Sequence, residues 1–449
     1  MCLLALIVAS RFAVAQVKHV VLISIDGLHP DMYLDKSWPC PNVRRLMREG
    51  TYADYLKSVF PSFTYPSHTA MVTGALPARS GIIYNQPVGS NGEWYWYSSS
   101  IRTPTLWQAL KKRGMTSATV LWPVTAETGE RNITWNVPDV WPISNPGDRA
   151  TVTKKYATPG LMEELEQQAT GRLDSSTYNE DYLSMDGQSG RIAAYILKTK
   201  RTSLLAVHFT SVDGMEHEHG RDADSVRIAL ASVDHAIGDI LEAIRRAHLQ
   251  DSTAVIVLGD HGFSTLHTVM RPNMLIKGVK ATFIAAGGSA FLYRYRDTKA
   301  EDIPGIVKAI TDSLNKLPKE RRKLFHIIDR KELDRMGADS AAILALAAEP
   351  GMVFSRSVEP AKTVNTGAGT KIQRSQLEGV FIPTTGGHHG FDPELPDMYT
   401  GFVAWGAGII KGGHIHSLSE PDIAPLIANL LGIEFTAPDG KLVPGIMKP

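Results

Sequence analysis

The stretch His19–Gly27, with the sequence HVVLISIDG, predicts the fold of this chain. Its first seven residues form a largely apolar, β-branched run, and an aspartate followed by a glycine comes directly after it. A continuous apolar run of this length is typical of a parallel strand buried on both faces. Asp26 therefore stands at the carboxyl end of a predicted strand, which is the edge where open α/β sheets bind their ligands.

Further apolar runs resemble this one, and helical patterns lie between them. The runs are Leu204–Phe209 (LLAVHF), Ala254–Leu258 (AVIVL) and Phe402–Trp405 (FVAW). Residues Thr105–Arg113 and Asp224–Arg246 carry apolar side chains at helical spacing. This alternation predicts an α/β fold with a doubly wound, mostly parallel sheet that has helices on both faces.

The pattern of a strand followed by an acid stops between residues 273 and 383. A strand-like segment at Ala290–Tyr293 precedes a helical pattern over Ile303–Leu317. We expect a smaller α+β insertion over residues 273–383. It would separate a first part of the catalytic core, residues 16–272, from a second part, residues 384–449.

The first fifteen residues are predicted to be a secretory signal peptide. Met1–Ser10 is a short apolar run, and Ala13 and Ala15 place small residues before Gln16, as at a signal cleavage site. The alternative is a buried N-terminal strand. A signal peptide predicts that the protein is exported to the periplasm or the extracellular space.

The overall charge argues against several kinds of partner. The chain has 449 residues and a formal net charge of +1, so it has no global field that favours duplex nucleic acid or an anionic membrane. It also lacks a run of about 18 apolar residues, and we expect no stable membrane insertion. An anionic substrate must therefore be held by a local site. The sequence does not indicate an oligomeric state.

Aspartates follow separate predicted strands in the same way. Asp26 follows the first strand, Asp213 follows the run that begins at Leu204, and Asp260 follows the run that begins at Ala254. A single aspartate–glycine pair is an ordinary turn signal. Three carboxylates at one sheet edge repel one another unless a cation joins them, so the arrangement predicts a metal cluster.

Histidines close to these aspartates supply further ligands. His217 lies four residues after Asp213, which places both side chains on one face of a helical turn. His261 follows Asp260, and His389 belongs to the glycine-rich segment GGHHGF at residues 386–391. Carboxylate and imidazole ligands without thiolates favour zinc in an open catalytic site. Other histidines are interpreted as structural, namely His208, His219, His235 and His388.

A nucleophile is predicted in the segment Phe60–Thr69, FPSFTYPSHT. Pro66 fits the first turn of a helix, which places Thr64 near the positive end of that helix. A hydroxyl coordinated to a metal there would lose its proton readily and attack phosphorus. The alternative is that Thr64 only caps the helix, and the nearby aspartates and histidines favour catalysis.

These segments together resemble the nucleotide pyrophosphatase/phosphodiesterase (type I phosphodiesterase) family of the alkaline phosphatase superfamily. The resemblance covers most of residues 16–449. The motifs that carry it are Asp26-Gly27, the block around Thr64, Gly81–Asn85, Asp213-x-x-x-His217-x-x-Gly220, Gly259–Gly262 and His389–Asp392.

The resemblance implies two zinc ions and a covalent mechanism. One ion would be bound by Asp213, His217 and His389, and the other by Asp26, Asp260, His261 and the Thr64 oxygen. Asn85 would donate to a non-bridging phosphoryl oxygen. His389 is preferred over His388 because the imidazole of the family directly precedes the glycine. The implied course is attack by Thr64, a phosphorylated or nucleotidylated threonine, and hydrolysis.

The substrate is predicted to be a small phosphodiester or pyrophosphate, such as a nucleotide. Tyr65 lies where nucleotide-cleaving relatives carry an aromatic residue that stacks on the base, and the aromatic cluster Trp94–Tyr97 could line the same pocket or pack on the sheet edge. A phosphomonoester has an additional negative charge, and the cations in the region where its partner would be sought are Arg149, Lys154 and Lys155, none of which the sequence places against the phosphate. The alternatives are a phosphomonoesterase or phosphonate hydrolase and, less favoured, a phospho-group transferase.

Overall fold

The computed structural model describes residues 17–128, 132–144, 148–178, 182–358 and 379–449. The predicted signal peptide lies outside the described residues. Within them, no helix is both long and apolar enough to cross a membrane.

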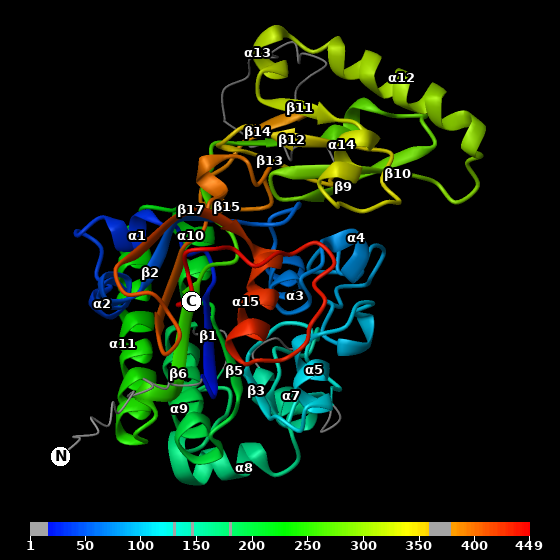
Figure 1. The fold of residues 1–449 in the computed structure, drawn as a ribbon. Helices are drawn as coiled ribbons and strands as arrows, with labels where there is room; N and C mark the ends of the chain where they lie inside the picture. The colour runs from blue at the N-terminus through cyan, green and yellow to red at the C-terminus, as the bar shows by residue number, and fades with distance from the viewer. Residues whose placement is uncertain (1–16, 129–131, 145–147, 179–181, 359–378) are drawn as a thin grey trace, which may run out of the picture.

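A large mixed sheet forms the centre of the molecule (Figure 1). Its strands, in spatial order, are β17 (Gly413–Ser419), β2 (Thr51–Lys57), β16 (Phe402–Gly406), β6 (Thr253–Leu258), β1 (His19–Ile25), β5 (Leu204–Phe209), β3 (Ser117–Val120) and β4 (Trp135–Val137). The central strand β1 pairs in parallel with β5 and β6, and Val21 lies opposite Leu205 and Val255. Every residue of β1 is buried, as its apolar run predicts.

Alternate residues of β1 enter cores on opposite faces of the sheet. Val21 and Ile23 pack on the face covered by α2 (Pro41–Glu49), α9 (Tyr182–Lys200) and α11 (Asp224–Arg246). Val20 and Leu22 pack on the other face, which is covered by α3 (Thr64–Thr73), α5 (Leu106–Lys112) and α15 (Ile423–Leu430). This arrangement confirms the predicted α/β class with helices on both faces.

The prediction that Phe402–Trp405 forms a parallel strand is wrong. Strand β16 runs antiparallel to β6, with Val403 opposite Val257, and antiparallel to β2 on its other side. An apolar run reports that a strand is buried on both faces, but it does not report the direction of the strand. The other inner pairs, β6–β1, β1–β5 and β5–β3, are parallel as expected.

A smaller antiparallel sheet lies beyond one end of the main sheet (Figure 1). Its strands are β11 (Phe325–Ile328), β12 (Leu344–Ala348), β10 (Ser289–Arg294) and β9 (Ala281–Ala286), and α12 (Ile303–Asn315) packs on it. A three-stranded sheet of β13 (Met352–Phe354), β8 (Thr268–Met270) and β14 (Phe381–Pro383) adjoins it. The division of the chain at residues 273 and 383 stays a prediction.

Further α-helices and short strands connect these parts of the fold. They are α1 (Asp31–Leu34), α4 (Pro77–Ser80), α7 (Arg149–Tyr156), α8 (Leu161–Leu165), α10 (Ser211–His219), α13 (Lys319–Arg322), α14 (Arg330–Arg335), β7 (Ser264–Thr265) and β15 (Gly387–His388).

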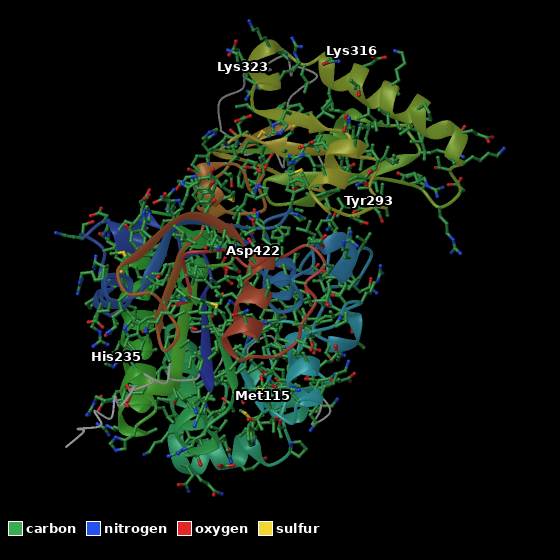
Figure 2. The ribbon with its side chains drawn as sticks, viewed as in Figure 1. Met115, His235, Tyr293, Lys316, Lys323 and Asp422 are labelled. Atoms are coloured by element: carbon green, nitrogen blue, oxygen red, sulfur yellow. The ribbon has the colours of Figure 1, made fainter. Side chains whose placement is uncertain are left out.

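A chain of hydrogen bonds links the smaller sheet to the core. Tyr293 of β10 lies on the side of the smaller sheet that faces the core (Figure 2). Its hydroxyl donates to Asp339 Oδ2 over 2.6 Å, and the hydroxyls of Tyr84 and Tyr293 are 2.5 Å apart. Because the Tyr293 proton goes to Asp339, Tyr84 donates to Tyr293. The bond ties the segment just before Asn85 to the smaller sheet.

Candidate active site

The predicted site residues surround a cavity of about 300 Å³ at the carboxyl end of β1 and β5. Its lining comes from segments that are far apart in the sequence. The lining residues are Asp26, Thr64, Tyr65, Asn85, Trp94, Asp139, Trp141, Arg149, His208, Thr210, Asp213, His217 and His389.

Thr64 begins helix α3, whose ten residues are all buried. The N-cap residue is Phe63, and no side chain caps the helix, so the alternative in which Thr64 is the cap is wrong. The Thr64 hydroxyl instead lies 3.3 Å from His261 Nε2. The positive end of the helix dipole favours a negatively charged oxygen at this position.

Asp26, Asp260 and His261 form one group of potential ligands, with one donor atom from each lying within 4.8 Å of the others. His261 Nε2 lies 3.2 Å from Asp26 Oδ1 and 3.4 Å from Asp260 Oδ2. With the Thr64 hydroxyl beside the same nitrogen, the structure brings together the four residues predicted for one zinc ion.

Asp213, His217 and His389 approach one another as a second group. Asp213 Oδ1 lies 3.4 Å from His217 Nε2 and 3.8 Å from His389 Nε2. His217 Nδ1 donates to the Gly387 carbonyl over 3.1 Å, and His389 Nδ1 donates to the Ser62 carbonyl over 2.9 Å. A carbonyl only accepts, so these bonds fix the ring tautomers and leave both Nε2 atoms free to bind a metal.

The two groups adjoin each other. The rings of His261 and His389 stack with their centroids 3.7 Å apart. One potential ligand atom from each of Asp213, His261 and His389 also lies within 4.8 Å of the other two. His388 forms a further trio with His217 and His389. The distances alone therefore allow more than one partition of the ligands between two ions.

Carboxylate oxygens in these groups lack hydrogen-bond partners. Asp26 Oδ1, Asp213 Oδ1 and Asp260 Oδ2 are buried atoms without a partner in the described part of the chain. A buried, unpartnered carboxylate oxygen is costly unless a cation or donor satisfies it. Together with the free imidazole nitrogens, these atoms fit divalent cations.

Burial shapes the charge state of these groups in the metal-free protein. Burial, followed by the charge of Asp213, raises the pKa of Asp26 well above its ordinary value, and burial also raises the pKa of Asp260. Burial lowers the pKa of His261 and of His389. The imidazoles are therefore neutral, which is the form that binds a metal.

Two histidines outside the predicted site contact it directly. His208 Nε2 lies 3.1 Å from Asp26 Oδ2, and His68 Nδ1 donates to the Thr64 carbonyl over 2.7 Å. His208, interpreted from the sequence as structural, thus contacts Asp26 and also lines the cavity. The available signal was a polar side chain near the end of the otherwise apolar run Leu204–Phe209. For His68, the signal was its spacing of four residues from Thr64 on one helix.

The helix that carries Asp213 and His217 is fixed by a buried acid that the sequence interpretation did not identify. Asp186 of α9 accepts hydrogen bonds from the backbone N–H groups of Thr210 (3.0 Å) and Ser211 (2.8 Å), at the start of α10. These N–H groups have no partner within their own helix. Asp186 therefore caps α10 from a neighbouring helix.

Asn85 and Tyr65 lie where substrate is expected, although Tyr65 is less accessible than predicted. The Asn85 Oδ1 accepts from the backbone N–H of Tyr65 over 3.0 Å, which leaves the amide nitrogen free to donate. Tyr65 is 1% exposed, and its hydroxyl donates to Asp139 Oδ2 over 2.9 Å. Trp94 and Trp141 also line the cavity, with ring centroids 4.9 Å apart.

Comparison with known proteins gives the family. The model of the type I phosphodiesterase / nucleotide pyrophosphatase family matches residues 20–392. The chain belongs to this family. It is accordingly a phosphoric ester hydrolase, and the family and fold predicted from the sequence are confirmed.

Similar proteins agree with the family assignment. Ectonucleotide pyrophosphatase/phosphodiesterase family member 7 of Rattus norvegicus is 21% identical, over 96% of this chain and 86% of its own length. Venom phosphodiesterase 2 of Crotalus adamanteus is 23% identical over 92% of this chain, which spans only 45% of the venom protein. The structure of murine ectonucleotide pyrophosphatase/phosphodiesterase 5, an inactive threonine-to-alanine variant in complex with AMP, aligns with a TM-score of 0.65 and 16% identity over 93% of this chain and 96% of that one.

Proposed function

We propose that this family member hydrolyses phosphodiester or pyrophosphate bonds of small nucleotide-like substrates, with Thr64 as the nucleophile. The observation that carries the proposal is the position of the Thr64 hydroxyl, at the positive end of a buried helix and beside buried carboxylate oxygens that lack partners. A structural relative solved as an inactive threonine-to-alanine variant with AMP supports both the threonine and the nucleotide.

We propose two zinc ions as the cofactors. Asp213, His217 and His389 would hold one ion, and Asp26, Asp260, His261 and Thr64 would hold the other. When bound, the ions supply positive charge that lowers the pKa of the nucleophile and offsets the charge of the phosphoryl group. Carboxylate and imidazole donors without a thiolate support zinc in a site that keeps positions open.

The residues of the chain then act in two displacements. Thr64 Oγ1 forms a bond to phosphorus while the bond to the leaving oxygen breaks, and the hydroxyl proton passes to solvent water, from which the leaving oxygen can take up a proton. The free amide N–H of Asn85 donates to a non-bridging oxygen, whose charge grows in the transition state. Water then attacks the phosphorus, breaks its bond to Thr64 and regenerates the hydroxyl. We propose that Tyr65 contacts the organic group of the substrate from the cavity wall.

A comparison of substrates tests the proposal. The zinc-loaded protein should have a higher kcat/KM for p-nitrophenyl thymidine 5′-monophosphate than for p-nitrophenyl phosphate. A clear preference for the monoester would favour the alternative, a phosphomonoesterase.

We also propose export of the protein to the periplasm or the extracellular space. Relatives named as ectonucleotide and venom enzymes support export.

A further inference from the structure

Among the residues that the structure describes, Arg149 is the one lysine or arginine that lines the cavity of the candidate active site. It is the first residue of α7 and is 7% exposed. Two lysines of the same helix are directed elsewhere. Lys154 pairs with Glu166 over 2.7 Å, and Lys155 lies 5.0 Å from the centre of the Tyr156 ring. Within the described part of the chain, Arg149 is therefore the cationic side chain that the cavity offers.

The Arg149 side chain is held rigidly on two sides. Its Nη1 donates to Asp139 Oδ1 over 2.6 Å, and its guanidinium lies 4.7 Å from the centre of the Trp141 ring. The other Asp139 oxygen accepts from the Tyr65 hydroxyl over 2.9 Å. The guanidinium is thus linked through Asp139 to the residue that follows the nucleophile. A donor that is fixed in advance loses little conformational entropy when it binds a ligand.

Part of this buried guanidinium has no partner. Arg149 Nε is a buried atom without a hydrogen-bond acceptor in the described part of the chain. A guanidinium offers five N–H donors, and Asp139 takes only the Nη1 bond that the structure records. Buried charged donors are costly when unpaired, so this side chain in a cavity wall indicates an acceptor that the substrate supplies.

The same contacts determine the sign of the charge on a substrate group that can bind here. An aromatic face together with a carboxylate would suit a substrate cation such as a quaternary ammonium group. In this cavity Arg149 already occupies both the Trp141 face and the Asp139 carboxylate. What remains for the substrate is the donor side of a guanidinium, which matches the oxygens of phosphate or carboxylate groups.

We propose that Arg149 is a specificity-determining residue, and that it binds anionic phosphoryl oxygens of the substrate other than the one that Asn85 binds. The oxygens could belong to the attacked phosphoryl group of a monoester or to the adjacent phosphoryl group of a pyrophosphate. The inference rests on the proposed function, because it assumes that phosphorus is attacked from Thr64. It predicts that loss of Arg149 lowers turnover of substrates with additional anionic oxygens more than it lowers turnover of diesters whose second substituent is neutral.

Three substrates with the zinc-loaded full chain test this role. Bis(p-nitrophenyl) phosphate has a neutral second substituent, p-nitrophenyl phosphate has an additional anionic oxygen, and ATP has adjacent phosphoryl groups. The measured quantity is the ratio of kcat/KM for each anionic substrate to kcat/KM for the diester. In Arg149→Met, this ratio should fall by about 10- to 100-fold for at least one anionic substrate, which is the range for a charge-assisted hydrogen bond. The anionic substrate that loses most identifies the source of the oxygens.

Control variants separate this role from a structural one. Lys154→Met, on the same helix but outside the cavity lining, should leave the ratios unchanged. Arg149→Lys should restore part of the lost ratio because it keeps the charge. Arg149→Met/Asp139→Asn should fold even if the single variant does not, since no charge is left buried alone. Equal losses for all three substrates, or unchanged ratios, would overturn the proposal.

Binding measured without turnover separates this inference from the proposed function. In a Thr64→Ala background, the Kd for AMP or for ADP should rise at least about tenfold when Arg149→Met is added. If the unaltered protein cleaves none of the three substrates, the proposed function fails, while the Kd values still decide the role of Arg149. Unchanged Kd values for both nucleotides would contradict it.

Discussion

The backbone N–H of Tyr65 donates to the side-chain Oδ1 of Asn85 over 3.0 Å. This bond assigns the two ends of the Asn85 amide, because the oxygen is occupied at the start of the nucleophile helix and the nitrogen is left to donate. We therefore predict that Asn85→Asp lowers kcat/KM by about 10²–10³, as for the loss of a transition-state donor. Steady-state kinetics with p-nitrophenyl thymidine 5′-monophosphate as substrate would measure this decrease in kcat/KM.

The Asn85→Asp variant keeps the acceptor of that bond, which makes it a better test than alanine. Its zinc content and melting temperature should stay close to those of the unaltered protein, because Tyr65 keeps its partner. Activity within about threefold of the unaltered protein would show that Asn85 has no part in stabilising the phosphoryl group.

Thr64→Ala should lower kcat by a factor of at least about 10³, because the residue that forms the bond to phosphorus is lost. Zinc content, measured by mass spectrometry, should stay near that of the unaltered protein, since aspartates and histidines hold most of the proposed ligand positions. Thr64→Ser is the matched variant and should keep measurable activity. Full activity of the alanine variant would contradict the covalent mechanism.

Asp213→Asn should lower zinc content from two ions per chain to about one. The substitution removes the charge of the acid that both His217 Nε2 and His389 Nε2 approach. Asp31→Asn is a suitable control, because Asp31 lies near the sheet edge but pairs with Arg221 on the surface. Two ions per chain in Asp213→Asn would mean that the proposed partition of the ligands is wrong.

Metal removal should make the stability of the protein fall as pH rises. In the metal-free protein, burial raises the pKa of Asp26 and of Asp260. The folded state then keeps protons that the unfolded chain releases above about pH 4, so the free energy of unfolding decreases as pH rises. The melting temperature of chelated protein should drop from pH 5 to pH 8. The drop should be smaller in chelated Asp260→Asn, and an equal drop would locate the effect elsewhere.

Asp186→Ala should weaken metal binding without touching a ligand. Its carboxylate caps the helix that carries Asp213 and His217, through the N–H groups of Thr210 and Ser211. We expect a loss of about 1–3 kcal/mol in the free energy of unfolding and weaker retention of zinc during dialysis. Asp186→Asn keeps an acceptor oxygen and should be milder in both measurements. Similar zinc retention in all three proteins would show that the cap does not position the ligands.

The central strands and many site residues could be predicted from the sequence because each has a local signal. Apolar runs mark β1, β5 and β6, and an aspartate at the exit of each strand needs no knowledge of distant contacts. Helix α11 begins and ends at the predicted residues, Asp224 and Arg246, since its apolar spacing continues over its whole length. The direction of a strand relative to its neighbours depends on distant parts of the chain, so the apolar run of β16 does not indicate that it pairs antiparallel to β6.

The cavity wall depends on contacts that no local pattern records. Asp139 lies in the loop after β4 and Arg149 begins α7, and their side chains meet beside Tyr65 and Trp141. The sequence around Asp186 is likewise that of an ordinary helix, and its role as a cap depends on the position of α10 beside it. Tyr65 was expected to offer its ring to a base, yet its hydroxyl is bonded to Asp139. Its stacking role stays a prediction.

The position of His389 after the smaller sheet has a consequence for biosynthesis. A ribosome delivers Asp26, Thr64, Asp213, Asp260 and His261 first, and His389 only after residues 273–383 have been made. A nascent chain that ends before Gly387 also lacks β16, which pairs with β6. Full catalytic competence therefore arises late in translation. A chain that ends after Asp260 but before Gly387 would bear all three proposed acidic ligands but not the His389 imidazole that completes the proposed ligand set.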